Sequence, residues 1–186
     1  MARLYIALLH HPVINRRGEV IAAAVTNLDL HDIARAARTF GVRGFFVVTP
    51  LEDQRGFAQR IIDHWITGPG ADHIPDRRQA MQLIRITESL AEAVAAVTTA
   101  EGQPPVTVAT AARGYPQAID YPSLRGVLAA DRPHLLLLGT AWGLAPDVIA
   151  AADHVLAPVA GAGGYNHLSV RSAAAIILDR LLGQRG

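Results

Sequence analysis

Two glycine-bearing stretches near the C-terminal end constrain this 186-residue chain more than any other feature. The first, residues 135–146, reads LLLLGTAWGLAP and predicts a buried strand that opens into a turn with two glycines. The second, residues 161–175, reads GAGGYNHLSVRSAAA and predicts a glycine-rich loop that runs directly into a helix. Glycines let a backbone approach a ligand closely, and loop amides and carbonyls supply hydrogen-bonding groups. Together the stretches predict a pocket for a flat, partly charged small molecule.

The rest of the chain alternates between strand and helix patterns. Apolar runs predict strands at residues 4–9, 19–25, 44–50, 106–111, 134–138 and 154–157. Helical spacing, caps and breakers predict helices over residues 30–40, 54–66, 77–98, 123–130, 146–152 and 169–182. This alternation predicts an α/β fold with a mostly parallel sheet flanked by helices. We find no internal repeat, linker or low-complexity segment, and we expect a single domain over residues 1–186.

The helix predicted over residues 30–40 carries its start and stop signals in the sequence. Asn27 or Asp29 is available as the N-cap, and Gly41 stops the helix. Because the apolar residues fall at helical spacing, Arg35 and Arg38 are expected on another face.

The basic residues have an unusual composition. All 17 are arginine, and the formal net charge is only +1. A bias toward GC-rich codons explains the absence of lysine; phosphate or nucleic-acid contact is the functional alternative, since guanidinium groups match phosphate oxygens. An RNA partner would then need a local patch, for which the candidates are Arg16, Arg17, Arg35, Arg38 and Arg43.

The composition and the absence of several known motifs exclude some classes of active site. Without cysteine there is no disulfide, thiolate metal site or thiol nucleophile. The chain lacks a P-loop, a dinucleotide fingerprint after the first strand, a G-x-S-x-G elbow and an H-E-x-x-H helix. The eight histidines do not have ligand spacing, and His10 and His11 are expected to be structural, so we expect no metal. Since no apolar run approaches about 20 residues and no signal peptide is apparent, we expect a cytoplasmic protein without a membrane segment.

Three stretches, taken in order, resemble the motifs of the SPOUT superfamily of S-adenosylmethionine-dependent RNA methyltransferases. They are NLDLHDIARAARTFGV at residues 27–42, LLGTAWGL at 137–144 and NHLSVRSAAA at 166–175. The sequence of these motifs is most similar to that of a bacterial group found alone or fused to a tRNA guanine-37-N1 methyltransferase domain. The resemblance implies S-adenosylmethionine as cofactor, an RNA substrate (tRNA or rRNA), a C-terminal trefoil knot, and a homodimer with active sites at its interface.

The resemblance also implies which residues form the site. Cofactor-binding residues are expected in the second and third motif loops: Leu138, Gly139, Thr140, Trp142, Gly143, Leu144, Pro158, Gly161, Asn166, His167, Leu168 and Ser169. The first motif supplies the catalytic candidates. Arg35, from either subunit, would orient a phosphate or polarise the acceptor. Asp29 or Asp32 would act as general base toward a base nitrogen, and Asn27 would hold either group or simply cap the helix.

The first motif departs from the branch that methylates ribose 2′-oxygens. That branch carries glycine after the asparagine, whereas Asp29 and Asp32 occupy this region here. This difference disfavours ribose methylation and leaves a base acceptor or another site open. Two alternatives remain: a non-catalytic RNA-binding module on the same fold, and an enzyme using a different adenine-containing cofactor.

Overall fold

A computed structural model describes residues 2–184, excluding the side chains at positions 72 and 73. Its main sheet has six strands in the order β5-β4-β1-β7-β6-β8, and every neighbouring pair is parallel. The strands are β1 (Arg3–Leu9), β4 (Gly44–Val48), β5 (Ile84–Thr87), β6 (Val106–Thr110), β7 (Pro133–Gly139) and β8 (His154–Leu156). A small separate hairpin pairs β2 (Val13–Ile14) with β3 (Val20–Ile21) in antiparallel fashion. The predicted α/β class with a parallel sheet is confirmed.

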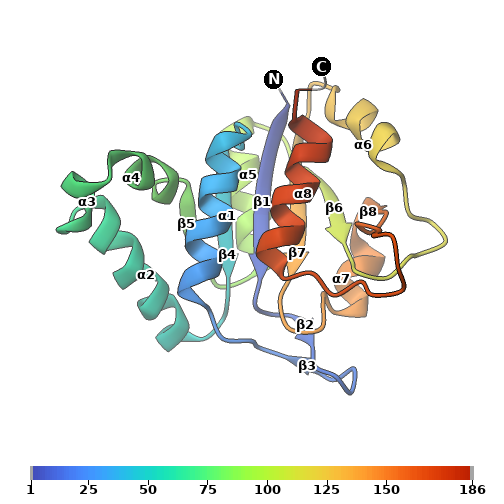
Figure 1. Cartoon of the computed structure of the whole chain (residues 1–186), viewed down its shortest axis with the longest axis horizontal. Helices are drawn as coiled ribbons and strands as arrows, with labels where there is room; N and C mark the ends of the chain where they lie inside the picture. Colours follow the sequence, from blue (N-terminus) through green and yellow to red (C-terminus); the bar gives the residue numbers. More distant parts are fainter. Residues whose placement is uncertain (1, 185–186) are drawn as a thin grey trace.

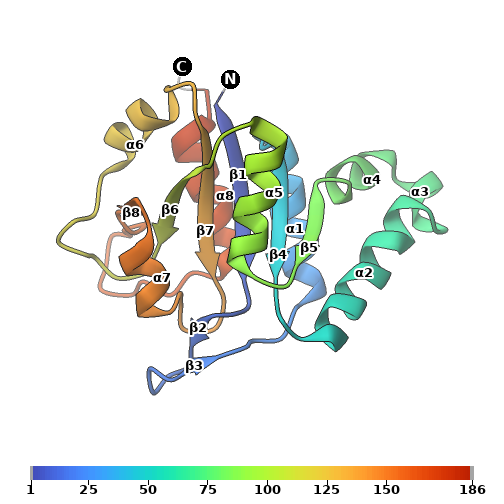
Figure 2. The ribbon, with the colours of Figure 1, turned by 180° about the vertical axis from the view of Figure 1, so that it is seen from behind.

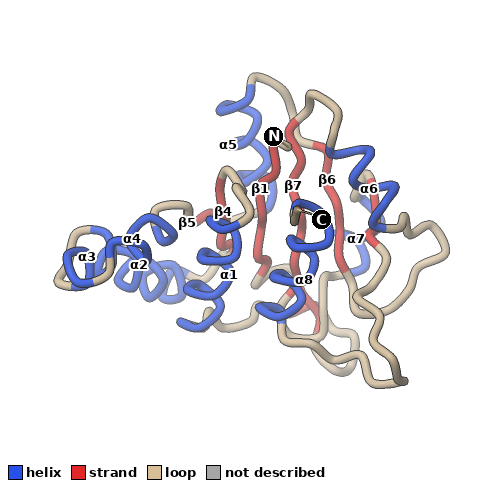
Figure 3. Tube along the Cα trace, turned by 45° about the horizontal axis from the view of Figure 1, so that its top comes forward, coloured by secondary structure: helices blue, strands red, loops and turns tan. Residues whose placement is uncertain are grey.

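Helices cover both faces of this sheet (Figure 1). They are α1 (Asn27–Thr39), α2 (Glu52–Ile66), α3 (Gly70–His73), α4 (Pro75–Met81), α5 (Leu90–Glu101), α6 (Tyr121–Leu128), α7 (Pro146–Ala151) and α8 (Val170–Leu182). Helices α1 and α8 lie side by side on one face, and α5 and α7 cover the other face (Figure 2). Helices α2 to α4 project beyond the edge strand β5 (Figure 3).

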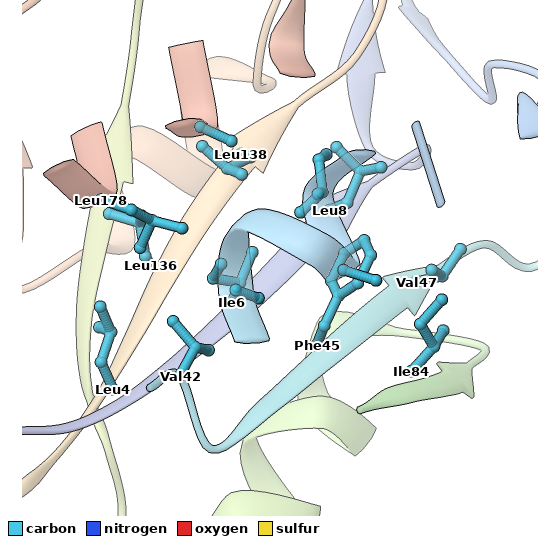
Figure 4. Packing of buried hydrophobic residues seen from close by; sticks show 14 of the residues in the cluster. Leu4, Ile6, Leu8, Val42, Phe45, Val47, Ile84, Leu136, Leu138 and Leu178 are labelled. Carbon is cyan, nitrogen blue, oxygen red and sulfur yellow. The ribbon is translucent and has the colours of Figure 1, made fainter. Parts of the chain in front are cut away.

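The alternation of side chains along β1 builds two cores. Ile6 and Ala7 are both fully buried, but they point to opposite faces of the sheet. Ile6 packs in the cluster under α1 and α8, which includes Phe45 and Leu178 (Figure 4). Ala7 packs in the cluster under α5 and α7. Burial on both faces explains why the sequence shows continuous apolar runs instead of an apolar–polar alternation.

The single helix predicted over residues 77–98 is wrong. The segment contains the end of α4, the edge strand β5 and most of α5. Strand β5 pairs with β4, with Phe45 opposite Ile84, and Ser89 caps α5 by accepting a hydrogen bond from the amide of Glu92 at 3.2 Å. Pairing at the sheet edge thus overrides the helical spacing of the apolar residues.

Two further expectations near the N-terminal end need correction. Of the strand predicted at residues 19–25, only Val20–Ile21 forms a strand, because its partner β2 is equally short. The N-cap of α1 is Thr26, whose hydroxyl accepts from the amide of Asp29, so Asn27 and Asp29 lie inside the helix. The stop signal is confirmed: α1 ends at Thr39, and Gly41 follows with a φ of 71°.

Within residues 2–184, no helix has the length and apolar character that crossing a bilayer requires.

Candidate cofactor-binding cleft and active site

A cleft of about 1030 Å³ lies beyond the carboxyl ends of β6, β7 and β8. Its walls are the hairpin between β2 and β3, the turns that follow the three strands, and the first turns of α8. The wall residues on α8 include Arg171, Ala173 and Ile177. Crevices at the carboxyl ends of parallel strands are the common ligand sites of α/β folds.

The turn after β7 is built on two glycines with different roles. A Cβ on Gly139 would lie 2.5 Å from the backbone nitrogen of Leu144, so the chain can close this turn only with glycine there. Gly143 has a φ of 109°, and its missing side chain would meet no atom within 4 Å. Since Gly143 lines the cleft, its hydrogen leaves space that a side chain would take from a ligand.

Hydrogen bonds fix this turn against β1 and the hairpin. The Thr140 hydroxyl donates to the carbonyl of Leu9 at 3.0 Å, and the Trp142 amide donates to the carbonyl of Ile14 at 3.0 Å. Trp142 as a whole remains 57% exposed. The turn is therefore rigidly placed while its aromatic side chain stays open to solvent.

The glycine-rich loop before α8 forms the facing wall. Its Asn166 donates from Nδ2 to the carbonyl of Ala112 at 2.7 Å, which ties the loop to the turn after β6. Ser169 caps α8 by accepting from the amide of Ser172 at 3.2 Å. Asn166 and Ser169 of the third motif therefore fix the backbone that lines the cleft.

An ion-pair cluster joins α1 to α8 at the end of the cleft. Arg171 donates from Nη1 to Oδ1 of Asp29 at 3.0 Å, and its Nε lies 3.3 Å from Oδ2 of Asp32. Asp29 is almost buried, with 9% of its side chain exposed, whereas that of Asp32 is 48% exposed. The buried pair fixes the first motif against the third.

A histidine lies buried close to this cluster at the end of β1. His10 is fully buried, and burial lowers its pKa to about 4, although the charge of Asp29 acts in the opposite direction. The imidazole is therefore neutral at neutral pH. Within the described residues, neither ring nitrogen makes a hydrogen bond of good geometry, although the backbone of Ala24 is close enough to act on the pKa in the same direction as Asp29.

Most of the expected cofactor residues meet at the cleft. Those that line it are Leu138, Gly139, Thr140, Trp142, Gly143, Leu144, Pro158, Asn166, His167, Leu168 and Ser169. Gly161 belongs to the same loop but lies outside the lining.

The four expected catalytic residues do not all meet at the cleft, although Arg171 brings Asp29 and Asp32 together. Asp29 lines the cleft, and Asp32 reaches it only through Arg171. Asn27 is exposed at the start of α1 and lies outside the lining. Arg35 is exposed on α1. Burial is the main cause that lowers the pKa of His31, and the charges of Arg77 and Arg35 lower it further.

The arginines predicted as one RNA patch are divided between distant parts of the molecule. Arg16 and Arg17 line the cleft at the carboxyl ends of the strands. Arg43 lies just before β4, at the opposite end of the sheet, where it pairs with Glu101 at 2.6 Å. That expectation is therefore wrong for Arg43.

Sequence reasoning missed Arg171 and Arg113, which both line the cleft. One signal was available for Arg171. A cation in the first turn of a helix opposes the helix dipole, so its presence there indicates a carboxylate partner.

The comparisons with known proteins agree with this geometry. A family model described as SAM-dependent RNA methyltransferase matches residues 3–183. The chain belongs to this family. It is 47% identical over 180 residues to a tRNA (guanine-N(1)-)-methyltransferase of Oleidesulfovibrio alaskensis, covering 97% of the chain and 42% of that protein. It is also 41% identical over 179 residues to an uncharacterized protein of Aquifex aeolicus, covering 96% of the chain and 87% of that protein.

A solved methyltransferase structure has a fold similar to that of this chain. A SpoU methyltransferase of Streptomyces viridochromogenes, in complex with the cofactor AdoMet, has a TM-score of 0.57 at 21% identity, covering 98% of this chain and 58% of that one. The chain spans about two fifths of the length of the tRNA methyltransferase relative that it matches. The SPOUT fold and the family cofactor, S-adenosylmethionine, are thereby established. Within residues 2–184, excluding the side chains at 72 and 73, no group of three or more metal-ligating side chains is present.

Proposed function

We propose that the cleft binds S-adenosylmethionine and that the chain transfers its methyl group to an RNA nucleophile. The observation that carries this proposal is the convergence of the second and third motif loops on one cleft at the carboxyl edge of the sheet.

The residues present suit this cofactor. Val159 and Leu168 line the cleft and are partly exposed, so they offer apolar surface to an adenine ring, and the backbone of the two loops offers hydrogen-bonding groups. The open space at Gly143 leaves the cleft wide. Arg171 and Asp29 supply opposite charges at one end, where a carboxylate or an ammonium group of the ligand would find a partner.

Bound in this cleft, the cofactor supplies an electrophilic methyl group on a sulfonium sulfur. The nucleophile of the RNA forms the new bond to the methyl carbon, the carbon–sulfur bond breaks, and its electrons stay on sulfur in S-adenosylhomocysteine. The chain contributes by holding the reactants in line and by accepting the proton of the nucleophile.

We assign the proton-accepting role to Asp29 in preference to Asp32. Asp29 lines the cleft, while Asp32 faces solvent beside it. Arg171 engages Oδ1 of Asp29 and so fixes the orientation of its carboxylate. Where a base nitrogen of the RNA is the acceptor, this carboxylate takes its proton.

We further propose a homodimer and a trefoil knot, as the SPOUT resemblance implies. Arg35 does not line the cleft of its own chain, so its expected role requires a second copy that delivers it to the cleft. Asn27 and Gly161 would either take part in the site of this dimer or only shape the local backbone. A dimer would also place the exposed side chain of Leu28 beside the partner.

Transfer of a radiolabelled methyl group into RNA tests the proposal. The purified chain is incubated with labelled S-adenosylmethionine and, separately, with unmodified tRNA and rRNA; tRNA comes first because the named relative is a tRNA methyltransferase. Label in either RNA, lost in Asp29→Asn, supports the proposal. RNA binding without cofactor binding would support the non-catalytic module instead.

A further inference from the structure

Three exposed aromatic rings lie together at the rim of the cleft. Trp142 is 57% exposed and Tyr165 is 79% exposed, and both contact the ring of His167. The ring centroids of Trp142 and His167 are 5.9 Å apart, and those of Tyr165 and His167 are 6.4 Å apart. Large exposed rings at adjoining positions mark a binding surface, since burial is their usual state.

The volume of the cleft lies at the upper end of the range for small-molecule sites. Small-molecule sites usually measure roughly 300–1,000 Å³, and this cleft reaches about 1030 Å³. Trp142 and His167 belong to its lining, whereas Tyr165 stands outside it. Tyr165 therefore stays available to a second ligand when a cofactor fills the cleft.

Arginines flank these rings on two sides. The bond from the Trp142 amide to Ile14 ties the turn after β7 to the hairpin that carries Arg16 and Arg17, and all three side chains line the cleft. The bond from Asn166 to the carbonyl of Ala112 holds the turn with Arg113 next to the glycine-rich loop. Within residues 2–184, none of the three arginines takes part in an ion pair.

We infer that this rim is a stacking surface for an unpaired nucleobase of the RNA, with phosphates on the flanking arginines; the inference rests on the proposed function. Aromatic rings interleaved with guanidinium groups bind single-stranded nucleic acid, because every base offers a flat face and every nucleotide a phosphate. A duplex hides those faces. The preferred substrate segment is therefore a loop or a single strand.

The two tryptophans of the chain allow a direct optical test. In the Trp65→Phe variant, Trp142 is the only tryptophan and reports on the rim. Trp65 lies far along the chain in α2, where it packs against His31 with ring centroids 5.4 Å apart, and phenylalanine keeps an aromatic ring there. We expect oligouridylate to quench the Trp142 emission to saturation, and an RNA duplex at equal phosphate concentration to quench it less.

Tyr165 provides the matched variants. On the Trp65→Phe background, Tyr165→Ala should weaken oligouridylate binding about 5- to 150-fold, the range of base–aromatic stacking. Tyr165→Phe should keep the parent affinity, because it keeps the ring. Both variants should bind S-adenosylhomocysteine as the parent does, since Tyr165 lies outside the lining.

Three results would overturn the inference: equal affinity of Tyr165→Ala and the parent, equal quenching by duplex and single strand, or loss of the dimer in Tyr165→Ala during sedimentation. The last would show that a second copy of the chain covers the rings. Failure of the proposed function would be seen in a different measurement: the parent protein would then not bind S-adenosylhomocysteine.

Discussion

Arg171 on α8 donates a hydrogen bond from Nη1 to Oδ1 of Asp29 on α1, at 3.0 Å. This bond joins two motifs that are 142 residues apart in the chain. Because the Asp29 carboxylate is almost buried, it needs this partner, whereas Asp32 beside it can rely on water. The pair thus links the stability of the fold to the orientation of the group that we assign to proton transfer.

A double-mutant cycle measures this link. In chemical denaturation, Asp29→Ala and Arg171→Ala should show a coupling free energy of about 1–3 kcal/mol. The matched cycle with Asp32→Ala should give less than about 1 kcal/mol, because that carboxylate is half exposed. Equal coupling in the two cycles would contradict the special position of Asp29.

The buried His10 predicts a loss of stability in acid. Its pKa in the folded protein is about 4, against about 6.5 when unfolded, so below pH 6.5 the unfolded chain binds a proton that the folded chain does not. The free energy of unfolding should therefore fall by roughly 3 kcal/mol from this group as the pH drops from about 6.5 to about 4. In the His10→Leu variant, the free energy of unfolding should depend less on pH in this range. An unchanged slope of this free energy against pH would mean that His10 is not responsible.

Glycine at position 143 is predicted to be required by the backbone as well as by the ligand. Its φ of 109° makes Gly143→Ala unfavourable by about 1–3 kcal/mol, although no atom blocks the new Cβ. Gly126 in α6 is a matched control, since a Cβ there also meets nothing within 4 Å, and Gly126→Ala should stabilise the helix by about 0.5–1 kcal/mol. Thermal unfolding of both variants decides the point, and a neutral Gly143→Ala would refute the strain.

Arg35 is predicted to act across the proposed dimer. Arg35→Ala and Gly143→Arg should each lack methyl transfer, the first by losing the arginine and the second by filling the cleft. Mixed and reassembled, they should recover about a quarter of the parent activity, because half of the dimers then contain one intact site of two. No recovery from a mixture shown to exchange subunits would show that Arg35 does not act across the dimer.

Sequence patterns predicted the parallel sheet and the cleft because both depend on local signals. The apolar run of β7 and the glycines of the turn after it determine the backbone conformation at their own positions. The errors arise where long-range contacts decide. Pairing with β4 makes residues 84–87 a strand within a helical pattern, and the position of α8 beside α1 gives Arg171 its carboxylate partners.

Calorimetric titration with S-adenosylmethionine, and with S-adenosylhomocysteine as a second ligand, tests the central claim most directly. We predict micromolar binding of both ligands to the parent protein and to Arg35→Ala, and none to Gly143→Arg. Circular dichroism of each variant controls for folding, since Gly143→Arg also carries backbone strain. A folded parent protein that binds neither ligand would contradict the account, and the cleft would then have to serve RNA alone.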